Sequence, residues 1–213
     1  MSEIINLDKF YFEEFSRSIS KFTLKSKKKL FKKALFLDRD GVLIEDVHHI
    51  NSPKKVKLCP KVLDFLKDAR KKNYGLIVVT NQSSVSRSII SYQEYKAITS
   101  KFLSLLTEDI YPEFILSSFH LPKNTNNLEN YNWRKPGTGM IDYVLNISKF
   151  NTSQSYIIGD KLTDLIAGYR SGLSNFIYVK SKLHSNQSNL IKNWSIKESI
   201  PYKELIELDS SFI

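Results

Sequence analysis

The sequence predicts an α/β fold in which helices cover both faces of a doubly wound parallel sheet. Two observations support this prediction: five short apolar runs lack polar alternation, as strands buried on both faces do, and helical patterns lie between those runs. Repeated alternation of strand and helix favours parallel strands, because each helix returns the chain to the same end of the sheet. A chain of 213 residues fits one domain with additional segments.

The predicted strands are short and rich in β-branched or aromatic residues. They cover residues 34–37, 75–80, 113–118, 155–160 and 175–179. Helices are predicted where apolar residues recur at helical spacing. These cover residues 60–72, 91–110, 139–150 and 160–172. Because these elements fill the sequence between the polar motifs described below, we expect a fold without a separate cap domain.

Residues 1–33 differ from the predicted domain, which covers residues 34–213. Four apolar side chains in this segment follow one another at spacings of three, four and three residues: Phe12, Phe15, Ile19 and Phe22. This spacing predicts an amphipathic helix, and the run KSKKKLFKK after it predicts a basic linker. We expect the aromatic face of the helix to pack on the domain, with a partner or a membrane surface as the alternative.

Composition indicates a folded protein, with 41% hydrophobic and 25% charged residues. No apolar run reaches the roughly 20 residues that span a bilayer, and the N-terminus lacks the pattern of a secretory signal, so we expect a cytoplasmic protein with no membrane span. The single cysteine, Cys59, excludes an internal disulfide. With only four histidines it also excludes a cysteine-rich zinc site, so a metal would be held mainly by oxygen ligands.

The net charge of +10 is compatible with a polyanionic partner. The lysines are spread along a chain that is also rich in Asn, Ile and Ser, so we interpret the charge as a general compositional trend and expect no nucleic-acid partner. The same positive field would favour a phosphorylated small molecule. We expect the protein to be a monomer.

Four polar motifs fall at predicted strand ends or helix starts. In chain order they are LDRDG with Asp38 and Asp40, TNQSS with Thr80, RKP with Lys135, and GDKLTD with Asp160 and Asp164. The carboxyl ends of parallel strands meet at one edge of a sheet, and α/β proteins bind ligands there. The motifs therefore predict a single site. Hydrolysis of a phosphate monoester requires a nucleophile, an acid for the leaving oxygen and fixed positive charge, and these residue types supply them.

The motifs resemble those of the haloacid dehalogenase superfamily of phosphotransferases, which are a DxDG element, a Ser or Thr, a Lys and an acidic GDxxxD element. The resemblance covers about residues 34–180. Within the superfamily, FLDRDG, VVTNQS, RKP and GDKLTD are most similar to the group of heptose-1,7-bisphosphate 7-phosphatases and histidinol-phosphatases.

The resemblance implies a Mg²⁺-dependent phosphatase of a small phosphorylated sugar. The first candidate is the 7-phosphate of D-glycero-D-manno-heptose 1,7-bisphosphate, in the synthesis of activated heptose for lipopolysaccharide. A histidinol-phosphatase, a polynucleotide 3′-phosphatase and a catalytically degenerate binding protein are the alternatives. The chain has no GxxxxGK[ST] motif that would support a polynucleotide kinase role.

By this resemblance Asp38 is the nucleophile that forms an aspartyl-phosphate, and Asp40 is the general acid and base. A bend at Gly41 would aim the two carboxylates separately. Mg²⁺ would be held by Asp38, Asp160 and the backbone carbonyl of Asp40, and Asp164 would support this shell from behind.

The transferring phosphoryl group would be held by Thr80, Asn81 and Lys135. Arg134 would bind the remainder of the substrate, because a planar guanidinium suits a second phosphate. The further expected substrate contacts are Asp46, His49, Gln82, Ser83 and Lys161.

The chain departs from this phosphatase group in the segment before RKP, where a zinc loop of three cysteines and a histidine is common. Here Ser118 stands in place of one cysteine, Tyr131 and Trp133 replace a pair, and His120 remains. We therefore expect no zinc, and expect packing of Tyr131 and Trp133 with Phe119 to hold the loop instead.

Overall fold

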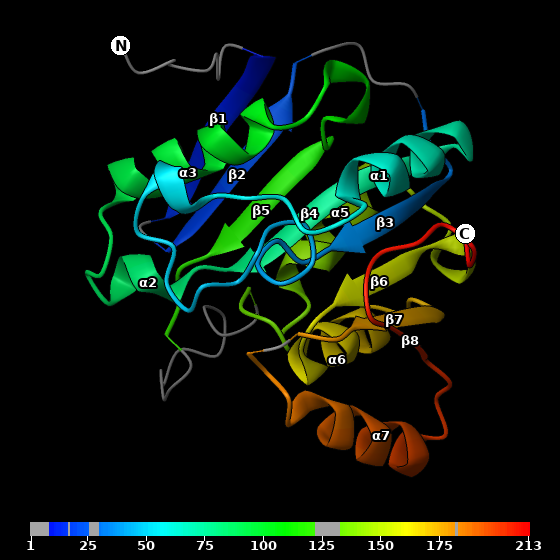
Figure 1. The fold of residues 1–213 in the computed structure, drawn as a ribbon. Coiled ribbons are helices and arrows are strands. Elements are labelled where there is room, and N and C mark those ends of the chain that lie inside the picture. The colour runs from blue at the N-terminus through cyan, green and yellow to red at the C-terminus, as the bar shows by residue number, and fades with distance from the viewer. Residues whose placement is uncertain (1–8, 17, 26–29, 122–132, 182) are drawn as a thin grey trace.

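A single eight-stranded sheet forms the centre of the protein, in the strand order β1-β2-β5-β4-β3-β6-β7-β8 (Figure 1). The structure is a computed structural model that describes residues 9–16, 18–25, 30–121, 133–181 and 183–213. The six strands from β5 to β8 in this order run parallel. The other two, β1 and β2, form an antiparallel hairpin at one edge.

The predicted strands are confirmed to within one residue at each end. They are β3 (Lys33–Leu37), β4 (Tyr74–Asn81), β5 (Phe114–Ser118), β6 (Tyr156–Gly159) and β7 (Asn175–Val179). The fold class is confirmed with them. A further strand, β8 (Lys203–Leu205), pairs with β7 at the other edge of the sheet. Its sequence KEL is too short and too polar to be recognised from apolar content.

The four predicted helices are present. Three of them begin and end within two residues of the predicted boundaries. They are α1 (Val62–Lys71), α3 (Tyr92–Ser104), α5 (Gly139–Ser148) and α6 (Leu162–Arg170). The exception is α3, which was expected to continue to residue 110. It starts at a capping box between Ser91 and Glu94, stops after Ser104, and is followed by the short 3-10 helix η3 (Glu108–Ile110).

Several short elements and one long helix have no predicted counterpart. They are the 3-10 helices η2 (Pro53–Lys55) and η4 (Thr152–Gln154), and the helices α2 (Ser83–Ser86) and α7 (Gln187–Glu198). Helix α7 buries only Ile191 fully, and two of its other apolar residues, Leu190 and Ile196, are exposed, so its sequence lacks the continuous apolar stripe on which the prediction depends.

Alternate residues of the central strands face two separate hydrophobic clusters. Leu35 and Leu37 of β3 pack with α1 and α3 on one face of the sheet, whereas Ala34 and Phe36 pack with α5, α6 and α7 on the other. The helices lie on these two sides in Figure 1. Burial on both faces explains why the strands are apolar without alternation.

The prediction of an amphipathic helix within residues 1–33 is wrong for the part that the structure describes. Residues Phe10–Ser16 and Ile19–Leu24 form the hairpin β1 and β2, and β2 pairs with β5. Phe12 lies opposite Phe22, with ring centroids 4.7 Å apart. Aromatic residues favour strands, and the edge of β5 offers unpaired backbone groups that a helix cannot use. Residues 1–8, 17 and 26–29, with part of the predicted basic linker, lie outside the described residues.

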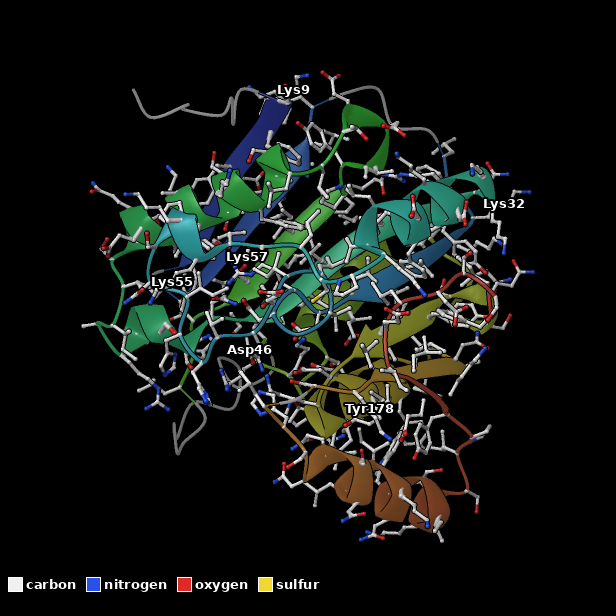
Figure 2. All side chains as sticks on the ribbon, viewed as in Figure 1. Lys9, Lys32, Asp46, Lys55, Lys57 and Tyr178 are labelled. Carbon is white, nitrogen blue, oxygen red and sulfur yellow. The ribbon has the colours of Figure 1, made fainter. Side chains whose placement is uncertain are left out.

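The connection between β3 and β4, residues 38–73, contains only η2 and α1, so no cap domain is inserted there. Among the described helices none is long and apolar enough to cross a membrane. Figure 2 shows Lys9, Lys32 and Lys55 on different sides of the molecule, in keeping with a dispersed positive charge.

Candidate active site

The carboxyl ends of the parallel strands bring the four polar motifs to one edge of the sheet. Asp38 directly follows β3, and its backbone N–H donates to the carbonyl oxygen of Ile158 in β6 at 2.9 Å. Thr80 lies at the end of β4 and Asp160 directly after β6. The neighbouring positions of β4, β3 and β6 in the sheet therefore place these side chains together.

The centre of the site is a buried ion-pair group that we call the lysine cluster: Asp38, Lys135 and Asp164. The Nζ atom of Lys135 lies 2.8 Å from Oδ1 of Asp38 and 2.7 Å from Oδ1 of Asp164, and it donates to the carbonyl oxygen of Val79 at 2.7 Å. Lys135 is only 2% exposed. All three donor positions of its ammonium group are therefore used.

The backbone of Lys135 is fixed by a reciprocal pair of hydrogen bonds. The side-chain Nδ2 of Asn81 donates to the carbonyl oxygen of Lys135, and the backbone N–H of Lys135 donates to Oδ1 of Asn81, both at 3.0 Å. Asn81 thus links the end of β4 to the loop that bears the lysine. This positions the ammonium group between the two aspartates.

The charges of the lysine cluster stabilise one another. Burial alone would lower the pKa of Lys135, but Asp164 and Asp38 outweigh it and raise that pKa. Burial would raise the pKa of Asp38, but Lys135 and then Lys161 hold it below its ordinary value. The pKa of Asp164 is raised, chiefly by burial, although Lys135 opposes the shift. The cluster therefore retains a charged lysine and an ionised Asp38 at neutral pH.

Asp40 is held away from Asp38 by different partners. Arg39 donates to both carboxylate oxygens of Asp40, with Nη2 at 3.1 Å from Oδ1 and 3.0 Å from Oδ2. Gln82 donates from Nε2 to Oδ2 of Asp40 and also to Oγ1 of Thr80. Gly41 follows with φ +89°, a backbone conformation that residues other than glycine rarely adopt, and it provides the expected bend.

Asp160 is the one predicted carboxylate whose oxygens both lack a hydrogen-bond partner in the described structure. Its side chain is 0% exposed, and burial followed by the charge of Asp38 raises its pKa to about 8. A Cβ atom added to Gly41 would lie 2.5 Å from Oδ2 of Asp160, so the chain passes very close to this carboxylate. A buried acid without partners is costly unless it holds a cation.

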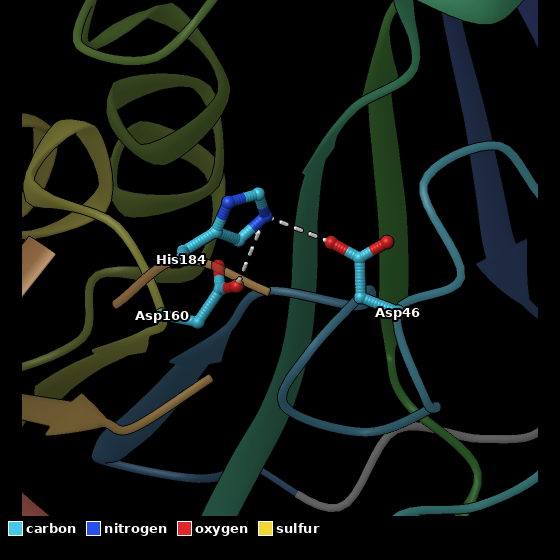
Figure 3. A group of neighbouring side chains, drawn as sticks. All are labelled: Asp46, Asp160 and His184. Atoms are coloured by element: carbon cyan, nitrogen blue, oxygen red, sulfur yellow. Dashed lines mark hydrogen bonds and ion pairs between the residues drawn. The ribbon is translucent and has the colours of Figure 1, made fainter. Parts of the chain in front are cut away.

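Asp160 also belongs to a second group, which we call the histidine cluster: Asp46, Asp160 and His184. The Nε2 atom of His184 lies 3.0 Å from Oδ2 of Asp46 and 3.9 Å from Oδ2 of Asp160 (Figure 3). Lys161 approaches the same carboxylates, with Nζ 3.5 Å from Asp160 and 3.8 Å from Asp46. The acids around Lys161, Asp160 first, raise its pKa in spite of burial.

A cleft of about 420 Å³ opens above these clusters. Nine predicted site residues line it: Asp40, Asp46, His49, Asn81, Gln82, Ser83, Arg134, Lys135 and Lys161. The four other predicted residues are buried beneath the lining: Asp38, Thr80, Asp160 and Asp164. The structure thus brings all thirteen predicted residues into one region. A volume of this size suits a small polar ligand.

Two lining residues are held by hydrogen bonds to neighbouring segments. Arg134 donates from Nη1 to the carbonyl oxygen of His120 at 2.8 Å, and Nδ1 of His49 lies 2.9 Å from Oγ of Ser84. Both side chains line the cleft, and their contact with a substrate stays a prediction.

The two described aromatic residues of the segment before RKP, Phe119 and Trp133, pack in different places. Phe119 packs against Tyr95, with ring centroids 4.9 Å apart, and Trp133 packs against Tyr143 at 5.7 Å. The two residues therefore contact different helices, α3 and α5. Tyr131 lies outside the described residues, so its expected contribution stays a prediction.

Two contacts at the site were not predicted. Arg39, which lies between Asp38 and Asp40 in the sequence, is buried and donates a hydrogen bond to Asp40. Its place within the motif LDRDG could have identified it as a site residue. His184 comes from the segment between β7 and α7, where the sequence SKLHSN has no recognisable pattern. Only the topology, which places β7 beside β6, brings it to the site.

The donor atoms fit a divalent cation. The carboxylates of Asp38, Asp160 and Asp164 each offer one oxygen within 4.8 Å of the others. Since Lys135 engages Asp164 and Asp38, the unpartnered Asp160 is the carboxylate that most requires a positive ligand. Oxygen donors at this density are typical of Mg²⁺ sites.

Residues 33–203 match the family model described as polynucleotide kinase 3 phosphatase. The chain is 32% identical over 182 residues to D-glycero-beta-D-manno-heptose-1,7-bisphosphate 7-phosphatase of Haemophilus ducreyi, covering 80% of this chain and 98% of that protein. It is 30% identical over 154 residues to D-glycero-alpha-D-manno-heptose-1,7-bisphosphate 7-phosphatase of Photorhabdus laumondii, covering 70% of this chain and 83% of that protein.

Among solved structures, the fold is similar to that of a protein from Mesorhizobium loti described as a candidate HAD-like phosphatase. The TM-score is 0.71 at 27% identity, with 79% of this chain and 83% of the other covered.

Proposed function

The chain belongs to the polynucleotide kinase 3 phosphatase family of haloacid dehalogenase-like phosphatases, and on that basis we propose that it is a Mg²⁺-dependent phosphatase of D-glycero-D-manno-heptose 1,7-bisphosphate. The observation that most supports this chemistry is the position of Asp38. It is buried against the Lys135 ammonium group, at the edge of the sheet where Asp40 and the unpartnered Asp160 also lie.

In the proposed reaction a carboxylate oxygen of Asp38 attacks the phosphorus atom. The bond between phosphorus and the sugar oxygen breaks, its electron pair stays on that oxygen, and Asp40 supplies the proton. Water then attacks the aspartyl-phosphate and gives its proton to Asp40, which releases phosphate and restores Asp38. Arg39 and Gln82 act on Asp40 as positioning residues, because each donates a hydrogen bond to it.

Lys135 and a bound Mg²⁺ would offset the repulsion between Asp38 and the phosphate. The carboxylates of Asp38 and Asp160 and the backbone carbonyl of Asp40 would hold the ion, which neutralises negative charge on the nucleophile and the phosphate. Lys135 contributes a second, permanent positive charge, since the acids around it raise its pKa. Thr80 is positioned by Gln82 beside Asp40 and would contact the phosphoryl group.

The sugar bisphosphate is favoured by the residues that line the cleft and by the names of the relatives. Arg134, Lys161 and His49 would bind the phosphate that is retained, with the planar guanidinium of Arg134 suited to two of its oxygens. The relative named for the beta anomer and the relative named for the alpha anomer have similar sequence identity to the chain, 32% and 30%, so both anomers belong in the test.

The test is phosphate release from both anomers of the heptose bisphosphate, with Mg²⁺ or with EDTA. The competing substrates are histidinol phosphate, fructose 1,6-bisphosphate and a 3′-phosphorylated oligonucleotide, which the family description suggests. We expect the heptose bisphosphate to be the fastest substrate, EDTA to stop the reaction, and Asp38→Asn to lower kcat by more than about 1,000-fold.

The matched control is Asp64→Asn, which removes an exposed acid of α1 and leaves the site unchanged. Faster release from another compound would discard the heptose assignment and keep the reaction class. Release from none of the compounds by the folded wild-type protein would favour the binding-protein alternative.

A further inference from the structure

The histidine cluster combines three segments that are distant in the chain. Asp46 comes from the loop after β3, Asp160 from the end of β6, and His184 from the segment after β7 (Figure 3). The backbone N–H of His48 donates to Oδ1 of Asp46 at 2.9 Å. The other oxygen, Oδ2, is directed at the imidazole of His184, 3.0 Å away.

The second observation at this cluster is the unsatisfied carboxylate of Asp160. Neither of its oxygens has a hydrogen bond in the described structure, although the side chain is fully buried. The nearest positive group, Nζ of Lys161, is 3.5 Å away, and that side chain is 34% exposed. A flexible and partly exposed lysine is a weak substitute for a ligand bound directly to the carboxylate.

The separations within the cluster are close to those that a metal ion requires. Bonds of about 2.0–2.2 Å from a metal to oxygen and nitrogen place neighbouring donor atoms about 3.0–3.5 Å apart. The imidazole nitrogen lies 3.0 Å from Asp46 and 3.9 Å from Asp160, and one donor atom from each of the three residues lies within 4.8 Å of the others. Small side-chain rotations would complete the geometry.

The donor set differs from that of the Mg²⁺ site proposed above. Mg²⁺ prefers oxygen ligands, whereas imidazole nitrogen suits Zn²⁺, Cu²⁺, Fe²⁺, Ni²⁺ and related transition-metal ions. Asp38, Asp160 and Asp164 offer only carboxylates to a metal, while the histidine cluster offers two carboxylates and one imidazole. The two groups of donors thus suit different classes of cation.

We propose that Asp46, Asp160 and His184 bind a divalent transition-metal ion at a site adjacent to the Mg²⁺ site, with Asp160 shared between the two. Lys161 turns outward when this ion binds, because its four-carbon side chain is partly exposed. Binding at this site depends on His184 and does not depend on Asp38.

The experiment is a titration of the full-length, untagged, EDTA-treated protein with Co²⁺ alone, followed by visible absorption and by calorimetry. We expect two equivalents of Co²⁺ per wild-type chain. His184→Ala and Asp46→Asn should each remove one equivalent or weaken it at least about 10-fold, and should remove the absorption that arises from nitrogen ligation. Asp38→Asn should weaken the other equivalent and retain that absorption.

The matched control is His49→Ala, which removes a histidine that lines the cleft and makes no contact with the cluster, and this variant should bind Co²⁺ as the wild type does. Far-UV circular dichroism verifies that each variant is folded. Equal Co²⁺ binding by wild type and His184→Ala, or loss of all binding in Asp38→Asn, would overturn the proposal. Because no substrate is present, these results are independent of whether the protein hydrolyses a heptose bisphosphate.

Discussion

The lysine cluster and the histidine cluster lie side by side, and they differ in whether their buried carboxylates are paired. In the lysine cluster the ammonium group of Lys135 contacts two aspartates at 2.8 and 2.7 Å, and the group is closed to solvent. In the histidine cluster the imidazole of His184 contacts Asp46, while Asp160 is left without a hydrogen bond.

The difference separates acids that are already paired from acids that await a ligand. A buried charge is tolerated when an opposite charge and hydrogen bonds satisfy it, and is costly otherwise. The lysine cluster therefore orients its aspartates within the folded protein itself. In the histidine cluster, ionised Asp160 is the unfavourable group, and a bound cation would stabilise it.

The largest expected effect comes from breaking the lysine cluster with Lys135→Met. Two buried carboxylates would then lack their positive partner, so the free energy of unfolding should fall by about 3–5 kcal/mol. Urea unfolding measures this change. The matched control is Lys161→Met, at a lysine that is 34% exposed and lies 3.5 Å from Asp160 and 3.8 Å from Asp46, where we expect a loss below about 1 kcal/mol. Similar losses in both variants would contradict the distinction between the clusters.

An opposite and smaller effect is expected for Asp160→Asn in metal-free protein. Burial and Asp38 raise the pKa of Asp160 to about 8, so its contribution to stability is full below the ordinary aspartate pKa near 4 and is lost as the pH rises towards 8. The Asn variant should therefore be more stable than wild type at pH 8, by about 1–3 kcal/mol. At pH 5 this difference in the free energy of unfolding should be smaller.

The comparison for this variant is Asp164→Asn, which removes an acid that Lys135 does satisfy and should destabilise the protein. Urea unfolding in EDTA at both pH values gives the sign of each change. Addition of Mg²⁺ should raise the midpoint of wild type and leave that of Asp160→Asn unchanged. A destabilised Asp160→Asn protein would show that Asp160 already has an adequate partner.

The smallest expected effect is at Cys59, which lies outside both clusters. Burial and the negative charges of nearby acids both raise the pKa of its thiol. Burial, and then Glu45, Asp160 and Asp40, raise its pKa to about 12. The thiol is therefore protonated at pH 8, and alkylation by iodoacetamide should be slow and should increase up to at least pH 10 without a plateau. A divalent cation near Asp160 should speed this reaction about two- to threefold at pH 8. A plateau below pH 9 would contradict the raised pKa.

The parallel part of the sheet was predictable because burial on both faces leaves a simple record in the sequence. Strand β3 shows it clearly: Ala34 and Phe36 face one hydrophobic cluster, and Leu35 and Leu37 face the other. The N-terminal hairpin was not predictable in this way. Phe12 and Phe22 fit a helical spacing as well as a strand, and only the exposed edge of β5 decides between the two.

The site divides along the same line. Asp38, Thr80 and Asp160 follow apolar strands, so their position at one edge of the sheet could be inferred from sequence. His184 lies in a segment without periodicity, and its approach to Asp46 depends on the length and path of the chain after β7. Contacts between loops leave no hydrophobic periodicity in the sequence, so the contact of His184 with Asp46 could not be predicted.

The position of the hairpin has a consequence for the order in which the chain is made. Strand β2, near the N-terminus, pairs with β5, whose residues leave the ribosome about a hundred residues later. At a synthesis rate of about 5–20 residues per second, the hairpin waits several seconds without its neighbour. Strand β8, the last of the described strands along the chain, completes the opposite edge. The newborn sheet therefore grows outward from β3 and β4, and its first-made strands take their place only after β5 has emerged.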